Sequence, residues 1–231
     1  MSQPLRLALL SCILFLSFGA AAAQPEPLSP ATAPDFSAAI APVVVRDLET
    51  GHVPGAVVLV GAKDRTVYRA AFGLRALEPA PDPMSADDIF DLASLTKVVA
   101  TTTAVMQLVE AGQIQLDAPA ATYWPAFAAN GKAGITIRQL LTHTSGLAPD
   151  LAVSESWNGL EEGLDRAAAA AAVHRAGAAF SYSDINFIVL GAIVSRVSGE
   201  PLDAYVQRHI FGPLGMADTG FHPPTPHLNC S

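Results

Sequence analysis

Apolar and polar positions along the chain repeat with two different periods, and the two periods predict different elements. Residues 35–51, "DFSAAIAPVVVRDLETG", have helical spacing despite an internal proline. Two strand-like runs follow, "GAVVLVGA" at 55–62 and "TVYRAAFG" at 66–73, with the polar letters "KDR" between them. The N-terminal part therefore predicts a helix followed by a β-hairpin.

After the hairpin, the pattern is helical to the end of the chain. Residues 90–112 predict a long helix, in which Leu95, Val98, Val105 and other apolar side chains recur at helical spacing and Gly112 is the stop. Further predicted elements are a short helix with a turn at 136–150, an alanine-rich helix at 159–177, and apolar helices at 183–199 and 201–215. No later strand-like segment completes a sheet, and a lone two-stranded hairpin is marginal.

The first residues are typical of an export signal. "MSQPLR" carries one positive charge, an apolar run follows, and small residues before position 24 suit cleavage, so we expect a signal peptide at 1–23. A lipoprotein box at "LLSC" (9–12) and an uncleaved anchor are the alternatives. Residues 24–34 predict a proline-rich linker, and 35–231 one partial domain. The expected location is periplasmic or secreted, with no stable membrane span after cleavage.

Composition sets limits on the partners. The chain has 231 residues, 51% of them hydrophobic, so it can bury a real core. Its net charge of −8, without a run of Lys or Arg, argues against nucleic acid or an anionic membrane surface as a partner. Oligomeric state is not predicted by any pattern.

One lysine stands where a charge is costly. Lys63, Lys97 and Lys132 are the only lysines, and Lys97 lies among apolar residues three positions after Ser94. On a helix, side chains three apart share a face, so the hydroxyl and the amine can meet. The helix dipole and apolar surroundings both lower a lysine pKa, and a neutral amine can take the serine proton. The bland alternative is a lysine that extends to water.

The residues around this pair resemble a known family. "FDLASLTK", "TIRQLLTHTSGL", "FSYSDINFIVLGAIV" and "IFGPLGMADTGF" occur in that order, over about residues 41–221. The chain is similar to the serine β-lactamase and penicillin-binding-protein superfamily, in its class C β-lactamase-like branch of esterases and D-alanyl-D-alanine peptidases. This resemblance implies an α+β fold with a helical lobe and an antiparallel sheet. It also implies an acyl-enzyme serine hydrolase that acts on an ester, amide or β-lactam carbonyl of a small-molecule or peptidoglycan-derived substrate, without a cofactor.

The resemblance also implies residue roles. Ser94 matches the acylated serine, Lys97 the lysine on the same helix, and Tyr182 the tyrosine that relays a proton to the leaving group. Asp184 falls where the family often has Asn; it is a candidate substrate-binding residue, and capping of the following helix is the alternative. His143, in "LLTHTSGL", is predicted to belong to a structural turn and not to a Ser-His pair.

The family's third motif, K-T-G or H-x-G on a late strand, does not occur after Tyr182. We therefore expect the C-terminal sheet strands to be missing, as in the N-terminal two-thirds of an enzyme. The rival hypothesis is an inactive fragment or a non-catalytic peptidoglycan-binding remnant of the same family.

Two other groups of residues suggest chemistry but have simpler explanations. His222, His227 and Cys230 have no usual zinc spacing, so we expect no metal site. Glu161, Glu162 and Asp165 predict a solvated helix face and not an acid-base pair.

Overall fold

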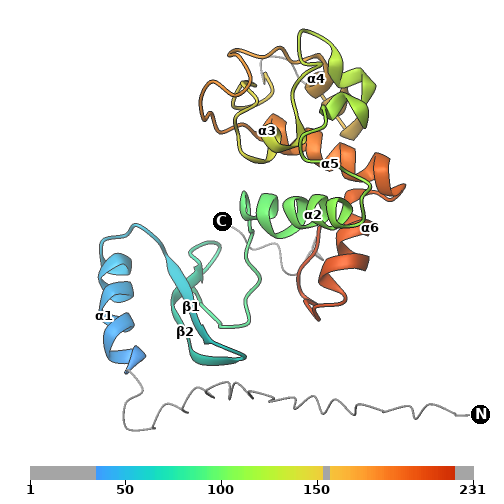
Figure 1. Ribbon diagram of the computed structural model, residues 1–231. Helices are drawn as coiled ribbons and strands as arrows, with labels where there is room; N and C mark the ends of the chain where they lie inside the picture. The colour runs from blue at the N-terminus through green and yellow to red at the C-terminus, as the bar shows by residue number, and fades with distance from the viewer. Residues whose placement is uncertain (1–34, 153–156, 222–231) are drawn as a thin grey trace, which may run out of the picture.

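The structure, a computed structural model, describes residues 35–152 and 157–221, and its elements form two groups (Figure 1). The N-terminal group contains helix α1 (Phe36–Glu49) and strands β1 (Gly55–Ala62) and β2 (Arg65–Ala76). Every other helix lies in a helical lobe that begins at Leu95. The expected signal peptide and linker lie outside the described residues.

The helix and hairpin predicted for the N-terminal group are confirmed. The Asp35 side chain caps α1 by accepting a hydrogen bond from the Ala38 amide at 3.1 Å. Strands β1 and β2 pair antiparallel, with Gly55 opposite Gly73, and α1 lies against β2. A third strand, β3 (Asp82–Pro83), pairs with β2 and was missed, because two residues are too short to show a period.

The helical lobe is built around α5 (Asp184–Ser198), which contacts α2 (Thr103–Glu110), α3 (Ile137–Leu141), α4 (Leu160–Ala169) and α6 (Leu202–Val206). Two π-helical segments adjoin these helices, η2 (Lys97–Thr102) before α2 and η5 (Gln207–Phe211) after α6. Two short 3₁₀ turns, η3 (Ala120–Thr122) and η4 (Pro125–Ala128), lie between α2 and α3. This order matches the series of helices that the sequence predicts.

The alanine-rich helix is shorter than predicted and ends at Ala169. Tertiary hydrogen bonds outweigh alanine's helix propensity here. The Lys132 ammonium binds the Ala168 carbonyl at 2.9 Å, and the Asn130 amide binds that of Ala169 at 2.6 Å. The backbone then turns away, and the amide of Val173 donates to the Gly146 carbonyl at 2.8 Å.

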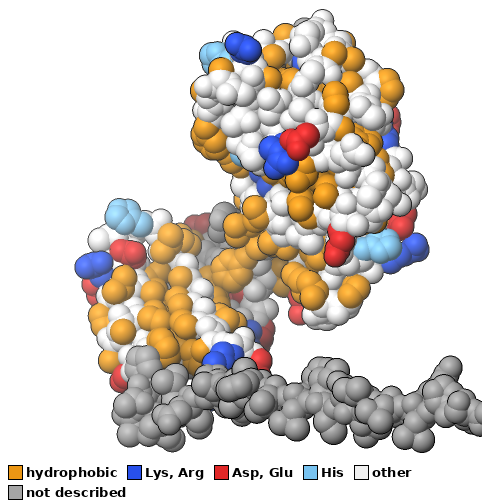
Figure 2. All heavy atoms as spheres, viewed as in Figure 1, with side chains coloured by type: hydrophobic (Ala, Val, Ile, Leu, Met, Phe, Trp, Pro, Cys, Tyr) orange, Lys and Arg blue, Asp and Glu red, His pale blue; other side chains and the backbone are white. Residues whose placement is uncertain are grey.

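The core lies in the lobe. Of the described apolar side chains up to residue 99, only Ala76 is buried, whereas the core cluster runs from Ala100 to Phe211. Hydrophobic side chains spread over the exposed hairpin face in Figure 2. The apolar residues at helical spacing in 90–112 differ in burial: Val105 is fully buried, while Leu95 and Val98 are 57% and 55% exposed.

Among the described residues, no single helix has the length and apolar character needed to cross a membrane. Helix α5 together with Leu202–Phe211 passes the same length and composition test only as a pair bent by 73°.

Candidate active site

Ser94 lies at the entrance to the first helix of the lobe. The preceding residue, Ala93, has a positive φ of 42°, an uncommon conformation for a residue with a side chain. The Asp91 carboxylate supports this turn by accepting a hydrogen bond from the Ala93 amide at 2.7 Å. Ser94 itself is exposed, and the π-helical segment that starts at Lys97 follows directly. Such segments are frequent at functional sites.

The four predicted site residues come together. Lys97 Nζ lies 3.1 Å from Ser94 Oγ and 2.7 Å from Asp184 Oδ1. The same ammonium lies 5.1 Å from the ring centroid of Tyr182. The Lys97 side chain is only 16% exposed, whereas that of Asp184 is 42% exposed and Ser94 is also exposed, so the lysine is shielded at a site that is open to solvent. Lys97 therefore does not extend to solvent: it joins the serine to the Tyr182–Asp184 segment.

Asp184 is the first residue of α5 and pairs with Lys97. Ser183 occupies the cap position of α5, without a capping hydrogen bond from its side chain. Asp184 therefore lies in the first turn of α5, beside Lys97, and not at the cap position.

The expected low pKa of Lys97 is wrong. Burial is the largest influence and does lower the pKa, but hydrogen bonding to Asp184 and Tyr182 and the negative charge of Asp184 together raise it above the ordinary value. The sequence argument considered the helix dipole and the apolar neighbours, and left out the effect of the Asp184 carboxylate on the Lys97 pKa. Lys97 is consequently an ammonium ion at neutral pH.

The Lys97 ammonium also affects the pKa of Tyr182. Hydrogen bonding to Lys97, and then to Ser94, lowers the pKa of the Tyr182 phenol below its ordinary value, because both donors stabilise the phenolate. Tyr182 is 44% exposed, so the residue lies partly in solvent. The arrangement thus holds a serine, a fixed cation and an acidified phenol within one hydrogen-bonded group.

The segment that carries Tyr182 is held by the turn at 143–149. The amide of Ser181 donates to the His143 carbonyl at 2.8 Å, and that of Asp184 donates to the Pro149 carbonyl at 2.7 Å. Between them, Ser183 Oγ donates to the Ala148 carbonyl at 2.6 Å. The "HTSGLAP" turn therefore fixes the backbone on both sides of Tyr182.

Two buried polar residues beside the site were not predicted as functional. His143 is 9% exposed and Asn186 is fully buried, and their side chains contact each other at 3.1 Å. Asn186 gave a usable signal, because it is the one polar letter in the run "INFIVLGAIV". The role of His143 in a turn was predicted, but its ring contacts depend on Tyr182, about 40 residues later in the chain.

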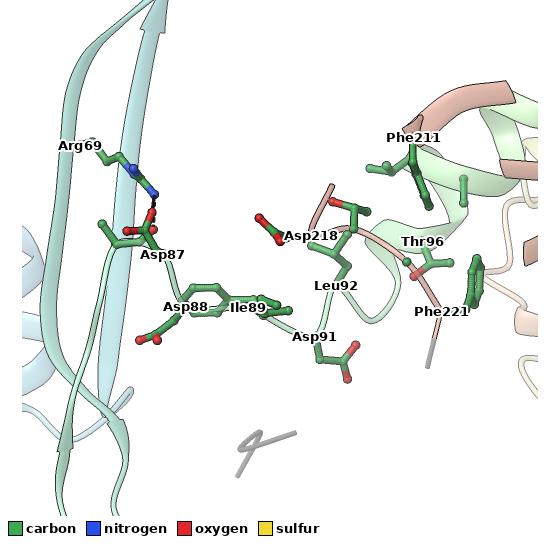
Figure 3. A pocket seen from close by; sticks show the side chains of 16 residues that line it. Arg69, Asp87, Asp88, Ile89, Asp91, Leu92, Thr96, Phe211, Asp218 and Phe221 are labelled. Carbon is green, nitrogen blue, oxygen red and sulfur yellow. Dashed lines mark hydrogen bonds and ion pairs between the residues drawn. The ribbon is translucent and has the colours of Figure 1, made fainter. Parts of the chain in front are cut away.

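A separate hollow of about 660 Å³ lies between the two groups of elements. Figure 3 shows Asp87 and Ile89 on the side of the hairpin, and Thr96 and Phe211 on the side of the lobe. Ser94, Lys97, Tyr182 and Asp184 do not line it. Within residues 35–152 and 157–221, no group of three or more His, Cys, Asp or Glu is placed to hold a metal ion. The C-terminal metal candidates lie outside those ranges.

The predicted solvated face of α4 is confirmed. Glu161, Glu162 and Asp165 are exposed, and Glu162 pairs with Arg166 one helical turn later at 3.1 Å.

Comparison with known proteins gives a consistent result. The Beta-lactamase family model matches residues 40–228. Esterase EstB of Burkholderia gladioli is 37% identical over 193 residues, which are 75% of this chain and 48% of that protein. A putative D-alanyl-D-alanine carboxypeptidase of Escherichia coli K12 is 31% identical over 199 residues, or 78% of this chain and 46% of that protein.

Solved structures agree on the fold. EstCE1, described as a hydrolase with promiscuous acyltransferase activity, aligns with a TM-score of 0.70 at 30% identity, over 78% of this chain and 52% of that one. A class C β-lactamase aligns with a TM-score of 0.71 at 22% identity, over 83% of this chain and 52% of that one, which supports the fold alone. The chain spans about half the length of the relatives that it matches. The ordered motifs, the fold and the family match together show that the chain belongs to the β-lactamase family of serine hydrolases.

Proposed function

We propose that this protein is an exported serine hydrolase that forms an acyl-enzyme on Ser94, with Tyr182 as the group that transfers protons and Lys97 as a fixed cation beside both. The observation that carries the proposal is the position of Lys97 Nζ, 3.1 Å from Ser94 Oγ and 2.7 Å from Asp184 Oδ1. A half-buried cation that contacts a serine hydroxyl stabilises the oxyanion that forms when the hydroxyl loses its proton.

The pKa directions favour a division of roles. Because the pKa of Lys97 is raised, its ammonium stays charged and stabilises anions. Because the pKa of Tyr182 is lowered, its phenolate is the group that accepts the Ser94 proton. Ser94 Oγ then bonds to the substrate carbonyl carbon, and the tetrahedral intermediate expels the leaving group. Tyr182 returns its proton to that group, and water later releases the acyl group by the reverse sequence.

The proposed substrates are carbonyl esters first, then amides of the D-alanyl type and β-lactams. An esterase at 37% identity supports the ester, and a putative carboxypeptidase at 31% identity supports the peptide. Asp184 differs chemically from Asn, since a carboxylate accepts hydrogen bonds and cannot donate them. We therefore place the β-lactam below the ester. The predicted signal at residues 1–23 supports a periplasmic or secreted location.

The direct test is the intact mass of residues 24–231 after exposure to a fluorophosphonate probe. We expect one adduct on the wild-type chain and none on Ser94→Ala. Ser85→Ala, a change to an exposed serine outside the site, is the control and should label as the wild type does. No adduct on a chain whose circular dichroism shows folded helices would contradict the proposal and leave the non-catalytic peptidoglycan-binding alternative.

A further inference from the structure

The ring of His143 lies flat against that of Tyr182. Their centroids are 4.4 Å apart and their planes 27° apart, a stacked arrangement. Phe187 and Phe180 enclose the imidazole further, at 5.2 Å and 5.9 Å between centroids. With only 9% of His143 exposed, the imidazole is a buried support for the phenol ring.

Hydrogen bonds determine which imidazole nitrogen carries the proton. The Ser183 backbone amide points at His143 Nδ1 from 3.1 Å, and a backbone N–H can only donate. Nδ1 must therefore be unprotonated. Asn186 Nδ2 lies 3.1 Å from the same nitrogen and donates a second hydrogen bond to it.

The rest of the network agrees with this assignment. The amide of Leu147 donates to Ser145 Oγ at 3.1 Å, so the Ser145 hydroxyl is free to donate to Asn186 Oδ1 at 2.6 Å. An Asn186 side chain that accepts through its oxygen presents its NH₂ group to His143. The hydrogen bonds therefore form one chain, in which Ser145 donates to Asn186 and Asn186 donates to the His143 imidazole.

We propose that His143, held as the neutral tautomer with its proton on Nε2, is a positioning residue that sets the ring plane of Tyr182 for proton transfer with Ser94. The inference rests on the proposed function, because it assigns His143 a role through Tyr182. Three features support it: the stacked geometry, the two donors at Nδ1, and the hydrogen bonds that tie Ser181 and Ser183 to the same turn.

Protonation of His143 would oppose this arrangement. A proton on Nδ1 would face two N–H donors and place a cation behind the Tyr182 ring. The charged groups nearby are Lys97, which disfavours a second cation, and Asp184, which favours one. Burial and then Lys97 lower the pKa of His143 below the ordinary value, so the neutral ring persists into mildly acidic solution.

A second histidine–tyrosine pair provides a matched control. His209 lies against Tyr205 with centroids 4.4 Å apart, but its Nε2 contacts the Glu200 carboxylate at 3.1 Å. This pair is outside the site, so His209→Asn changes the same kind of contact without touching Tyr182.

The test measures the rate of fluorophosphonate labelling of Ser94 against pH in the wild type, His143→Asn and His209→Asn. Asparagine suits the site because it tolerates the positive φ of 55° at His143 and can still accept a hydrogen bond there, while it removes the ring. We expect labelling of His143→Asn to be about tenfold slower or more. We also expect its Tyr182 ionisation, followed by ultraviolet absorbance, to move back toward the ordinary tyrosine pKa of about 10. His209→Asn should match the wild type in both.

A measurement on the unaltered protein covers the case in which His143→Asn fails to fold. Long-range ¹H–¹⁵N correlation spectra distinguish the two imidazole tautomers. We expect the ring of His143 to have an unprotonated Nδ1 and a protonated Nε2 at neutral pH. A proton on Nδ1 of His143, or a His143→Asn variant with the wild-type rate and Tyr182 ionisation, would overturn the inference alone. Absence of any labelling of the wild-type chain would overturn the proposed function and this inference with it.

Discussion

The two groups of elements in this protein are built by different means. The N-terminal helix and hairpin are held by backbone pairing and a few surface contacts, and Ala76 is their one buried apolar residue among those described. The helical lobe is held by a contiguous core that extends from Ala100 to Phe211. Secondary structure that the pattern predicts equally well in both groups therefore has very different tertiary support.

Most residues of the proposed active site belong to the lobe. Lys97, Tyr182 and Asp184 all belong to it, and the turn at 143–149 fixes the segment that carries the last two. Ser94 lies one residue before it, at the end of the connection from the hairpin. Four matched pairs of substitutions, and one comparison of the pH dependence of stability, test this division.

The largest contrast concerns catalysis. We expect Tyr182→Phe to slow the labelling of Ser94 about 10²–10⁴-fold, the usual effect of losing a general acid-base group. Tyr68→Phe, in the hairpin, should leave the rate unchanged. Wild-type labelling should rise with pH as the phenolate forms, at a midpoint below about 10, because the pKa of Tyr182 is lowered. No decrease should follow until Lys97 loses its proton above about 10.4, since its pKa is raised. A Tyr182→Phe variant with the wild-type pH profile would show that this tyrosine is not the base.

The next largest contrast concerns stability: truncation of a leucine should lower the free energy of unfolding far more in the lobe than in the N-terminal group. Leu190 is fully buried in α5, and Leu190→Ala should lower the free energy of unfolding of the lobe by about 2–5 kcal/mol. Leu59 is 58% exposed on β1, so Leu59→Ala should change the free energy of unfolding by less than about 0.5 kcal/mol. Urea denaturation followed by circular dichroism measures both. Equal losses would mean that the hairpin shares the core of the lobe.

A buried lysine offers the next contrast. Lys132 is fully buried, and its ammonium binds the Ala129 and Ala168 carbonyls at 2.6 Å and 2.9 Å. Lys132→Met leaves these carbonyls without that donor and should cost about 1–3 kcal/mol. Lys63→Met, at the exposed hairpin turn, should be close to neutral, and a thermal melt of each variant decides between these expectations.

Two glycines with positive φ, one in each group, test whether a local destabilisation spreads from one group to the other. Gly146 has φ of 79°, and a Cβ there would meet the His174 carbonyl oxygen. Gly73 has φ of 71°, and a Cβ there would meet the Pro54 carbonyl oxygen. Each change to alanine should cost at least about 1 kcal/mol locally. We expect Gly146→Ala to lower the melting temperature of the lobe, and Gly73→Ala to speed amide exchange in the hairpin only. A lobe destabilised equally by both would contradict the division.

The smallest effect is a dependence of stability on pH. Burial and then the charge of Lys97 lower the pKa of His143, so the unfolded chain binds more protons than the folded one below about pH 6.5. Stability present above that pH should therefore decrease on acidification, and less so in His143→Asn. The same dependence in the wild type and in His143→Asn would show that the folded state does not hold His143 neutral.

The success of the sequence analysis depended on the range of each interaction. Elements set by local pattern were predicted, such as helix α1 and the hairpin around 63–65. The four site residues followed from a motif resemblance, and the structure brings them together. What failed depended on distant partners: the Asp184 carboxylate reversed the expected pKa of Lys97, and Asn130 and Lys132 ended α4 early. A local pattern does not contain such contacts.

One measurement tests the central claim, that Ser94 and the lobe assemble the site without support from the hairpin. Ser94 labelling and amide exchange are followed together in rising urea, up to concentrations at which the amides of 55–62 exchange freely and those of 184–198 stay protected. The account predicts that Ser94 is still labelled there, within about twofold of the rate without urea. Loss of labelling as the hairpin opens, or protection of the hairpin equal to that of α5, would contradict it.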